Sequence, residues 1–314
     1  MNNIGPLVKS KREPDDFLVW RFGMKIILGP ASADLGLRVA QTLNLEPLRV
    51  SAKTFPDGES YVRIDGNIEN EDVVIIQTTS PPQDTRLIQL ALIADAAKRN
   101  NAKKVIAVVP YLAYARQDKV FLQGEAVSIE TVARMLKAAG IDALLTVNIH
   151  QEKVLERFPF PAKNLSAIPL LAKHFRDRGL EGAFALAPDK GAIYIAEEAN
   201  RILGGGYGYL EKHRNRYTGQ VSIERGGLDV AGKVVIIFDD IISTGGTIVA
   251  AAKILKEIGA SEVYAACVHP LLVGDAEKRI LEAGIREVIG TDSVPSSVSK
   301  VSLAPLLCDA LKEL

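Results

Sequence analysis

The fold of this chain is decided by the stretch Val234-Val235-Ile236-Ile237-Phe238-Asp239-Asp240-Ile241-Ile242-Ser243-Thr244-Gly245-Gly246-Thr247. Its first five residues are apolar and rich in β-branched side chains, and they predict a short buried strand that stops at two adjacent carboxylates. A loop with two glycines follows, and then a helical pattern from Ile248 to Ile258 that Gly259 ends. A loop between a parallel strand and a helix lies where α/β sheets bind ligands.

The chemistry of this loop indicates a ribose phosphate. Glycines let a phosphate approach the backbone, and the free N–H groups at the start of a helix attract its charge. Thr244 and Thr247 add hydroxyl donors. Asp239 and Asp240 would repel phosphate, so their natural partners are sugar hydroxyls or a divalent cation. The alternative is an ordinary strand, turn and helix with a capping aspartate.

Composition limits the class of protein. A length of 314 residues suits two domains of ordinary size. The formal net charge of zero gives no electrostatic reason to expect a nucleic acid or a membrane as partner. The sequence has no apolar run long enough for a membrane span and no signal-peptide pattern. With two cysteines, Cys267 and Cys308, a disulfide framework is not expected, and a cytoplasmic location fits best.

The sequence contains an internal repeat. A buried strand at 73–77, a helix at 86–100 and a strand at 104–109 lead from Val73 to Pro110, and the same order leads from Val234 to Pro270. The two spans differ by one position, 37 against 36. We therefore expect two α/β domains of the same design, each a mainly parallel sheet flanked by helices. Residues 1–23 are either a disordered leader or a segment that precedes a start at Met24.

Two further stretches could bind a nucleotide. Phe55-Pro56-Asp57-Gly58-Glu59 is a turn signal between strand-like runs, and a plain hairpin turn is its alternative. Arg116 and Gln117 follow the strand that ends at Pro110. A guanidinium plane can stack on a base or bind phosphate, and an amide can bond a base edge. A solvated charged loop is equally compatible with these residues.

Three other positions carry candidate chemistry. His150 follows the strand at 143–149, and Asp189 follows the strand at 185–187. If both strand ends face one cleft, these side chains could hold a divalent ion whose other ligands are phosphates; a structural histidine is the alternative. Residues 211–216 are strongly basic after a glycine-rich stretch, which fits either a solvated surface or an arm that closes over polyphosphate.

Taken in order, these segments resemble the ribose-phosphate pyrophosphokinase family. The loop at 239–247 is shared with type I phosphoribosyltransferases, whereas the Arg-Gln-Asp and Lys-x-Arg elements are not, and the details look most like the archaeal branch. The resemblance implies two phosphoribosyltransferase-type (type I) domains, at 24–163 on the ATP side and at 164–299 on the ribose 5-phosphate side. A C-terminal helix at 300–314 would follow.

The resemblance also implies a role for each segment. The enzyme would transfer diphosphate from Mg-ATP to the C1 hydroxyl of ribose 5-phosphate. Catalysis would depend on Lys212 and Arg214, and Mg²⁺ would bind His150 and Asp189. The ATP-binding residues would be Phe55, Asp57, Gly58, Glu59, Arg116, Gln117 and Asp118. The ribose 5-phosphate-binding residues would be Arg214, Asp239, Asp240, Ser243, Thr244, Gly245, Gly246 and Thr247. The family further implies a homo-oligomer built on dimers with a shared ATP site.

The sequence departs from the bacterial members of that family in three places. Ser243 and Asn148 each replace an acid, and Lys119-Val120 replaces a pair of arginines. Two other functions remain open from the sequence. One is a phosphoribosyltransferase that consumes phosphoribosyl diphosphate, which the ATP-type segments disfavour. The other is a regulatory relative that only senses the ligand, which would not need the basic arm.

Overall fold

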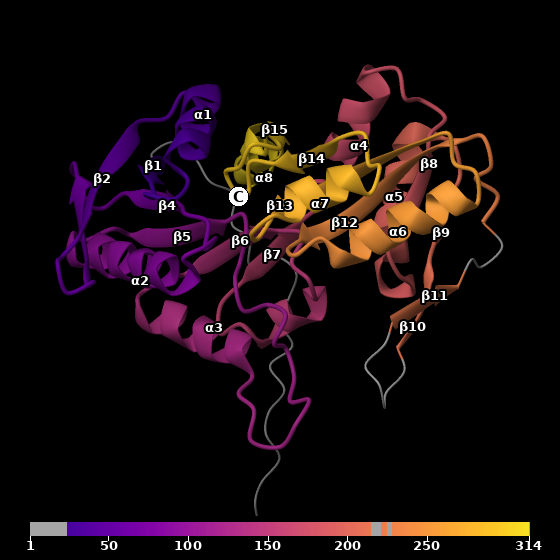
Figure 1. Cartoon of the computed structure of the whole chain (residues 1–314). Coiled ribbons are helices and arrows are strands. Elements are labelled where there is room, and N and C mark those ends of the chain that lie inside the picture. Colours follow the sequence, from indigo (N-terminus) through magenta and orange to yellow (C-terminus); the bar gives the residue numbers. More distant parts are fainter. Residues whose placement is uncertain (1–23, 215–220, 225–227, 314) are drawn as a thin grey trace, which may run out of the picture.

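The computed structural model describes residues 24–214, 221–224 and 228–313 of the chain. The predicted leader at 1–23 lies outside the described residues. Two large sheets dominate the structure, and they lie side by side with helices on both faces (Figure 1).

The first sheet has seven strands in the order β3-β2-β1-β4-β5-β6-β7. All neighbours are parallel except β2 and β3, which form an antiparallel hairpin. The order reverses between β1 and β4, so the sheet is doubly wound. Its strands are β1 (Met24–Leu28), β2 (Pro47–Thr54), β3 (Ser60–Asp65), β4 (Asp72–Ile76), β5 (Lys104–Val109), β6 (Ala143–Val147) and β7 (Ala162–Leu165).

The second sheet has six strands in the order β15-β14-β13-β12-β8-β9, and all its pairings are parallel. A separate antiparallel ribbon pairs β10 with β11. The strands are β8 (Phe184–Ala187), β9 (Tyr207–Tyr209), β10 (Glu211–Arg214), β11 (Val221–Glu224), β12 (Val234–Ile242), β13 (Glu262–Pro270), β14 (Val288–Thr291) and β15 (Ser299–Val301).

Helices cover both faces of each sheet, and the three larger apolar cores of the described residues lie beneath them. One core lies under α2 and α3 on the first sheet, and another lies under α6 and α7 on the second. The third is continuous across both sheets and is covered by α1, α4, α5 and α8. The helices are α1 (Ala33–Leu43), α2 (Gln83–Arg99), α3 (Ser128–Ala138), α4 (Ile168–Asp177), α5 (Ile193–Leu203), α6 (Gly246–Glu257), α7 (Ala276–Glu282) and α8 (Ala304–Lys312). Two 3₁₀ turns, η1 (Glu152–Arg157) and η2 (Lys190–Ala192), complete the described elements.

The predicted fold class is confirmed. The unit β4-α2-β5 in the first sheet and the unit β12-α6-β13 in the second are the two copies of the expected repeat, and each joins neighbouring parallel strands. The boundary expected between residues 163 and 164 falls inside β7, which belongs to the first sheet. Residue 300, expected in the last helix, belongs to β15, and the helix begins at Ala304.

One prediction about the central stretch is wrong. The strand does not stop at the two carboxylates, because β12 continues through them to Ile242. Asp239 lies opposite Cys267 and Ile241 opposite His269, so β13 extends the ladder past the acidic pair. The carboxylates are therefore held on rigid paired backbone instead of on a loop.

In the part of the chain that the structure describes, no helix combines the length and the apolar character that crossing a membrane would require.

Candidate active site

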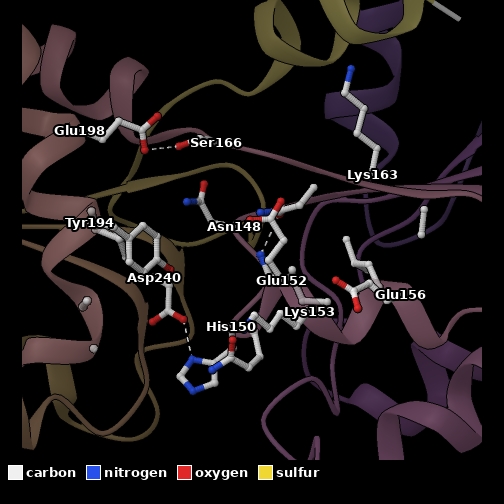
Figure 2. Close-up of a pocket in the computed structure, with 18 of the residues that line it drawn as sticks. Asn148, His150, Glu152, Lys153, Glu156, Lys163, Ser166, Tyr194, Glu198 and Asp240 are labelled. Carbon is white, nitrogen blue, oxygen red and sulfur yellow. Dashed lines mark hydrogen bonds and ion pairs between the residues drawn. The ribbon is translucent and has the colours of Figure 1, made fainter. Parts of the chain in front are cut away.

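A large cavity lies where strands of the two sheets end. Its volume is about 1320 Å³, and it is bounded by the segments after β6 and β8, by η1 and α5, and by the acidic pair of β12. Figure 2 shows side chains from both halves of the chain pointing into this space. Of the predicted site residues, it brings together His150, Asp189, Asp239 and Asp240.

His150 and Asp240 form a direct contact between the two sides of the cavity. The Nδ1 atom of His150 lies 2.6 Å from Oδ2 of Asp240, as the dashed line in Figure 2 marks. This hydrogen bond raises the pKa of His150 above its usual value, against the opposing effect of burial. Burial also acts to raise the pKa of Asp240, but the bond to His150 and its positive charge outweigh burial and lower that pKa. Both shifts favour the ion pair that a protonated His150 forms with the carboxylate of Asp240.

The pKa of Asp239 shifts in the opposite direction to that of Asp240. Burial first, and then the negative charge of Asp240 beside it, raise the pKa of Asp239 well above its usual value. The charge of Asp189 acts in the same direction. A group held in this state gains from any nearby cation, because the cation favours the ionised form. The cavity is therefore suited to a positively charged ligand or to hydroxyl groups.

Asp189 caps the turn that follows β8. Its Oδ1 atom accepts hydrogen bonds from the backbone N–H groups of Gly191 at 2.8 Å and Ala192 at 3.2 Å. Oδ2 takes no part in this cap, and the residue lines the cavity. Among the described residues, no group of three or more His, Cys, Asp or Glu side chains is arranged to hold a metal ion. An ion at His150 and Asp189 would therefore need ligands from a bound phosphate.

The predicted phosphate loop follows β12 directly. Gly245 has a φ of 75°, and a Cβ atom there would lie 2.8 Å from Cδ1 of Ile280, so this position requires glycine. Arg279 donates to the carbonyl of Thr244 at 2.7 Å, and the carbonyl of Ser243 accepts from Val273 at 3.0 Å. With these carbonyls bonded behind the loop, the N–H groups that open α6 are available to an anion.

Arg116 lies near the same site from the first sheet. A cavity of about 50 Å³ is lined by the segment 111–116, by His150 and by His269. Arg116 is exposed, and its charge opposes protonation of His150. Neighbouring contacts order this segment: Gln117 donates to Glu125 at 3.4 Å, and the carbonyl of Asp118 accepts from Arg157 at 2.7 Å.

The other predicted residues lie apart from the large cavity or outside the described side chains. Phe55, with 39% of its surface exposed, is on the β2–β3 hairpin, where it packs edge-on against Tyr61. The hairpin residues line neither of the two cavities, and in Figure 1 β2 and α6 lie at opposite sides of the molecule. The backbone of Lys212 and Arg214 belongs to β10, but their side chains lie outside the described part of the chain.

Several residues of the site were not anticipated. Tyr194 and Glu198 reach the cavity from α5, and Glu152 reaches it from η1 (Figure 2). Burial and the surrounding carboxylates raise the pKa of Tyr194 to about 12. Tyr194 and Glu198 follow Asp189 in the sequence, and Glu152 follows His150. This proximity was the signal from which these three residues could have been predicted. Asn148 instead supports the loop, because its Oδ1 accepts from the backbone of Ala167 at 2.7 Å.

Comparison with known proteins agrees with this geometry. Residues 24–140 match the model of the N-terminal domain of ribose phosphate pyrophosphokinase, and residues 223–311 match that of the phosphoribosyl synthetase-associated domain. Ribose-phosphate pyrophosphokinase of Methanobrevibacter smithii is 44% identical over 298 residues, which are 92% of this chain and 100% of that protein. The chain belongs to the ribose-phosphate pyrophosphokinase family.

Further members of the family support this assignment. The enzyme of Methanothermobacter thermautotrophicus is 45% identical over 90% of this chain and 98% of its own length. Both of these relatives are archaeal, as the sequence predicted. The crystal structure of phosphoribosylpyrophosphate synthetase from Mycobacterium smegmatis matches with a TM-score of 0.83 and 32% identity, covering 93% of this chain and 98% of that one. The two-sheet architecture is therefore that of a pyrophosphokinase of this family.

The ion pair predicts a measurable titration. We expect the pKa of His150 to lie above 6.5 in the metal-free protein and to fall below 6.5 in Asp240→Asn, because burial and the charge of Arg116 then dominate. An NMR pH titration of the imidazole protons measures this. The pKa of His174, which burial and Arg178 lower, is the internal control and should not change. Equal His150 values in the two proteins would contradict the ion pair.

The raised pKa of His150 also determines how the ion pair's contribution to stability changes with pH. Because the folded-state pKa of His150 is raised, the pair stabilises the fold fully below pH 6.5, and this contribution is lost as pH rises through the raised value.

Proposed function

We propose that this protein transfers diphosphate from Mg-ATP to the C1 hydroxyl of ribose 5-phosphate, giving 5-phosphoribosyl 1-diphosphate and AMP. The observation that carries the proposal is the cavity at which His150 from the first sheet meets Asp240 from the second, at 2.6 Å. A transferase that consumes phosphoribosyl diphosphate would need only the carboxyl-terminal edge of one sheet. A reaction between two phosphorylated substrates benefits from two edges that face each other.

The ribose 5-phosphate would lie on the second sheet. The 5-phosphate would bind the residues from Ser243 to Thr247, where the N–H groups of α6 and the threonine hydroxyls are donors. Asp239 and Asp240 would accept hydrogen bonds from the ribose hydroxyls. Their position on the paired backbone of β12 supports this role, because a rigid acceptor pair loses little entropy on binding.

The ATP would lie towards the first sheet, with Arg116 and Gln117 beside the phosphates or the base. When bound, Mg²⁺ would neutralise part of the negative charge on the ATP phosphates. Its proposed protein ligands are His150 and Asp189, and the oxygen-rich lining of the cavity suits this hard cation. The raised pKa of Asp239 fits the same site, because a cation would relieve the repulsion among these carboxylates.

The chemistry requires alignment more than covalent participation of the protein. The anomeric oxygen attacks the β-phosphorus, the bond from that phosphorus to the α,β-bridging oxygen breaks, AMP leaves and the hydroxyl proton is lost. The residues on β12 would hold the attacking hydroxyl, and Lys212 and Arg214 would stabilise charge on the transferred diphosphate. The antiparallel pairing of β10 with β11 supports a projecting ribbon that carries these two cations.

We also propose a homo-oligomer built on dimers, in which the hairpin residues Phe55, Asp57, Gly58 and Glu59 complete the ATP site of the neighbouring subunit. The support is that this hairpin exposes an aromatic ring and lines neither cavity of its own chain. The two buried, unpaired cysteines fit a reducing cytoplasm. We place the division between the two domains after Leu165, where the first sheet ends.

Release of AMP from ATP tests the proposed reaction. We expect release that depends strictly on ribose 5-phosphate in the wild type. In Asp239→Asn or Asp240→Asn the affinity for ribose 5-phosphate should weaken about ten- to a hundredfold, since a lost charged hydrogen bond costs about 1.5–3 kcal/mol. Asp229→Asn is the matched control, because Asp229 is an exposed residue paired with Lys233. Unchanged affinity in both test variants would refute the ribose assignment, and ATP turnover without ribose 5-phosphate would refute the reaction.

Turnover of Lys212→Ala tests the basic ribbon. Loss of one preorganised electrostatic group costs about 3–4 kcal/mol, or roughly 10²–10³ in rate. We expect kcat to fall by this amount while the affinities for ATP and ribose 5-phosphate change little, since the charge develops in the transition state. Lys278→Ala removes an exposed helical lysine and is the control. A kcat within about threefold of wild type would assign the ribbon to solvated surface.

Subunit mixing tests the shared ATP site. Phe55→Ala and Arg116→Ala should each be inactive alone, because each removes one side of the adenine site. After subunit exchange, mixed dimers contain one intact site, so part of the activity should return. Exchange is followed by mass spectrometry of the native assembly. Complete exchange without recovered activity would place each site within one chain.

A further inference from the structure

His269 is a buried polar residue that the proposed reaction does not use. It lies on β13 opposite Ile241, the residue that follows the acidic pair of β12. Only 2% of its surface is exposed, and it does not line the large cavity. A buried imidazole needs partners for both ring nitrogens, so its contacts indicate what it does.

The two ring nitrogens of His269 bond to different sheets. Nε2 lies 3.0 Å from the carbonyl oxygen of Val147, the last residue of β6 in the first sheet. Nδ1 lies 2.9 Å from the hydroxyl of Ser293, which follows β14 in the second sheet. Tyr111 packs on the ring with a centroid distance of 5.0 Å. The imidazole is thus fixed between the two sheets on all sides.

These contacts determine the tautomer. Burial lowers the pKa of His269 to about 4, so the ring is neutral and carries one proton. A carbonyl oxygen only accepts, so this proton is on Nε2 and is donated to Val147. Nδ1 then carries no proton, and the Ser293 hydroxyl lies 2.9 Å from it. The same hydroxyl donates to the carbonyl of Val268 at 2.6 Å, and this carbonyl also accepts from Thr291 at 2.7 Å.

The carbonyl that His269 holds lies three positions before His150. Beyond Val147 the chain is fixed from the other side, where Asn164 accepts from the N–H of Ile149 at 3.0 Å. The short segment that ends at His150 is therefore held at its start by the second sheet and in its middle by the first. A shift of Val147 relative to β13 would move His150 relative to Asp240.

We propose that His269 is a positioning residue, which ties the end of β6 to the strand beside Asp239 and Asp240 and so sets the distance across the active site. It acts through His150 and not on the substrates. A displacement of about 1 Å at a reacting group can cost about a hundredfold in rate. The kinetic part of the test rests on the proposed function, whereas the structural part does not.

Two polar substitutions at His269 test its hydrogen bond to the carbonyl of Val147. His269→Gln places an amide donor near Nε2 and keeps the bond to Val147. His269→Asn is shorter and loses that bond. We expect kcat for AMP release to fall about ten- to a hundredfold in His269→Asn and to stay within about threefold of wild type in His269→Gln. Thr78→Val is the control, because the Thr78 hydroxyl makes another buried bond between the sheets, to the carbonyl of Ser293 at 2.7 Å.

A double-mutant cycle separates positioning from general destabilisation. If His269 acts through His150, then His269→Asn should change kcat less than about twofold in a His150→Ala background. The same loss in both backgrounds, or an equal loss in Thr78→Val, would show a merely structural role and overturn the proposal. If His269→Asn does not fold, His269→Leu, which also removes the donor to Val147 but fills more of the buried space, replaces it in the same cycle with the same criteria.

Crystal structures of the variants test the positioning role of His269 without any measurement of activity. In His269→Asn the distance from Nδ1 of His150 to Oδ2 of Asp240 should exceed hydrogen-bonding range, and in His269→Gln it should stay near the 2.6 Å of the wild type. A distance unchanged in His269→Asn would overturn the proposal even if activity fell. If the wild type released no AMP, the reaction would be refuted, and these distances would still decide the role of His269.

Discussion

The continuous apolar core under α1, α4, α5 and α8 is the constraint on which the site depends. Both sheets contribute to it, so neither can rotate against the other without exposing buried side chains such as Val39 of α1 and Cys308 of α8, where Sγ of Cys308 lies 3.8 Å from the carbonyl oxygen of Val39. The ends of β6 and β12 meet because this packing brings them together. Exposed ion pairs at the rim, such as Lys163 with Glu313, add little by comparison.

The site is costly in the absence of its ligands. Asp189, Asp239 and Asp240 are among six carboxylates that line one cavity, and of these three Asp240 forms an ion pair within the described residues, with His150. Burial, and then the repulsion from Asp240 and Asp189, raise the pKa of Asp239. The cation and the hydroxyl groups of the proposed substrates would recover stability given up in this way, which is the usual relation between a functional site and the fold that supports it.

Local features of the site were predictable from sequence, and features that depend on register were not. The glycine loop before α6 and the hairpin that carries Phe55 follow from turn chemistry, which involves only neighbouring residues. The extension of β12 through Asp239 and Asp240 depends on β13 continuing beside it, and a single strand does not encode its partner. The bond between His150 and Asp240 joins positions 90 residues apart, so only the packed structure reveals it.

The internal repeat explains why the two sheet edges behave differently. Counted from the first valine of each unit, Thr78 and Thr79 occupy the positions of Asp239 and Asp240. Both threonines are fully buried, and their hydroxyls bond within the protein, Thr78 to Ser293 and Thr79 to the carbonyl of Tyr111 at 2.8 Å. The first copy thus has internally bonded hydroxyls, one of which joins the two sheets, where the second copy has acids that line the cavity. Because a threonine can satisfy its hydrogen bonds internally and an isolated carboxylate cannot, the first of these positions is a buried junction in one copy and the proposed binding edge in the other.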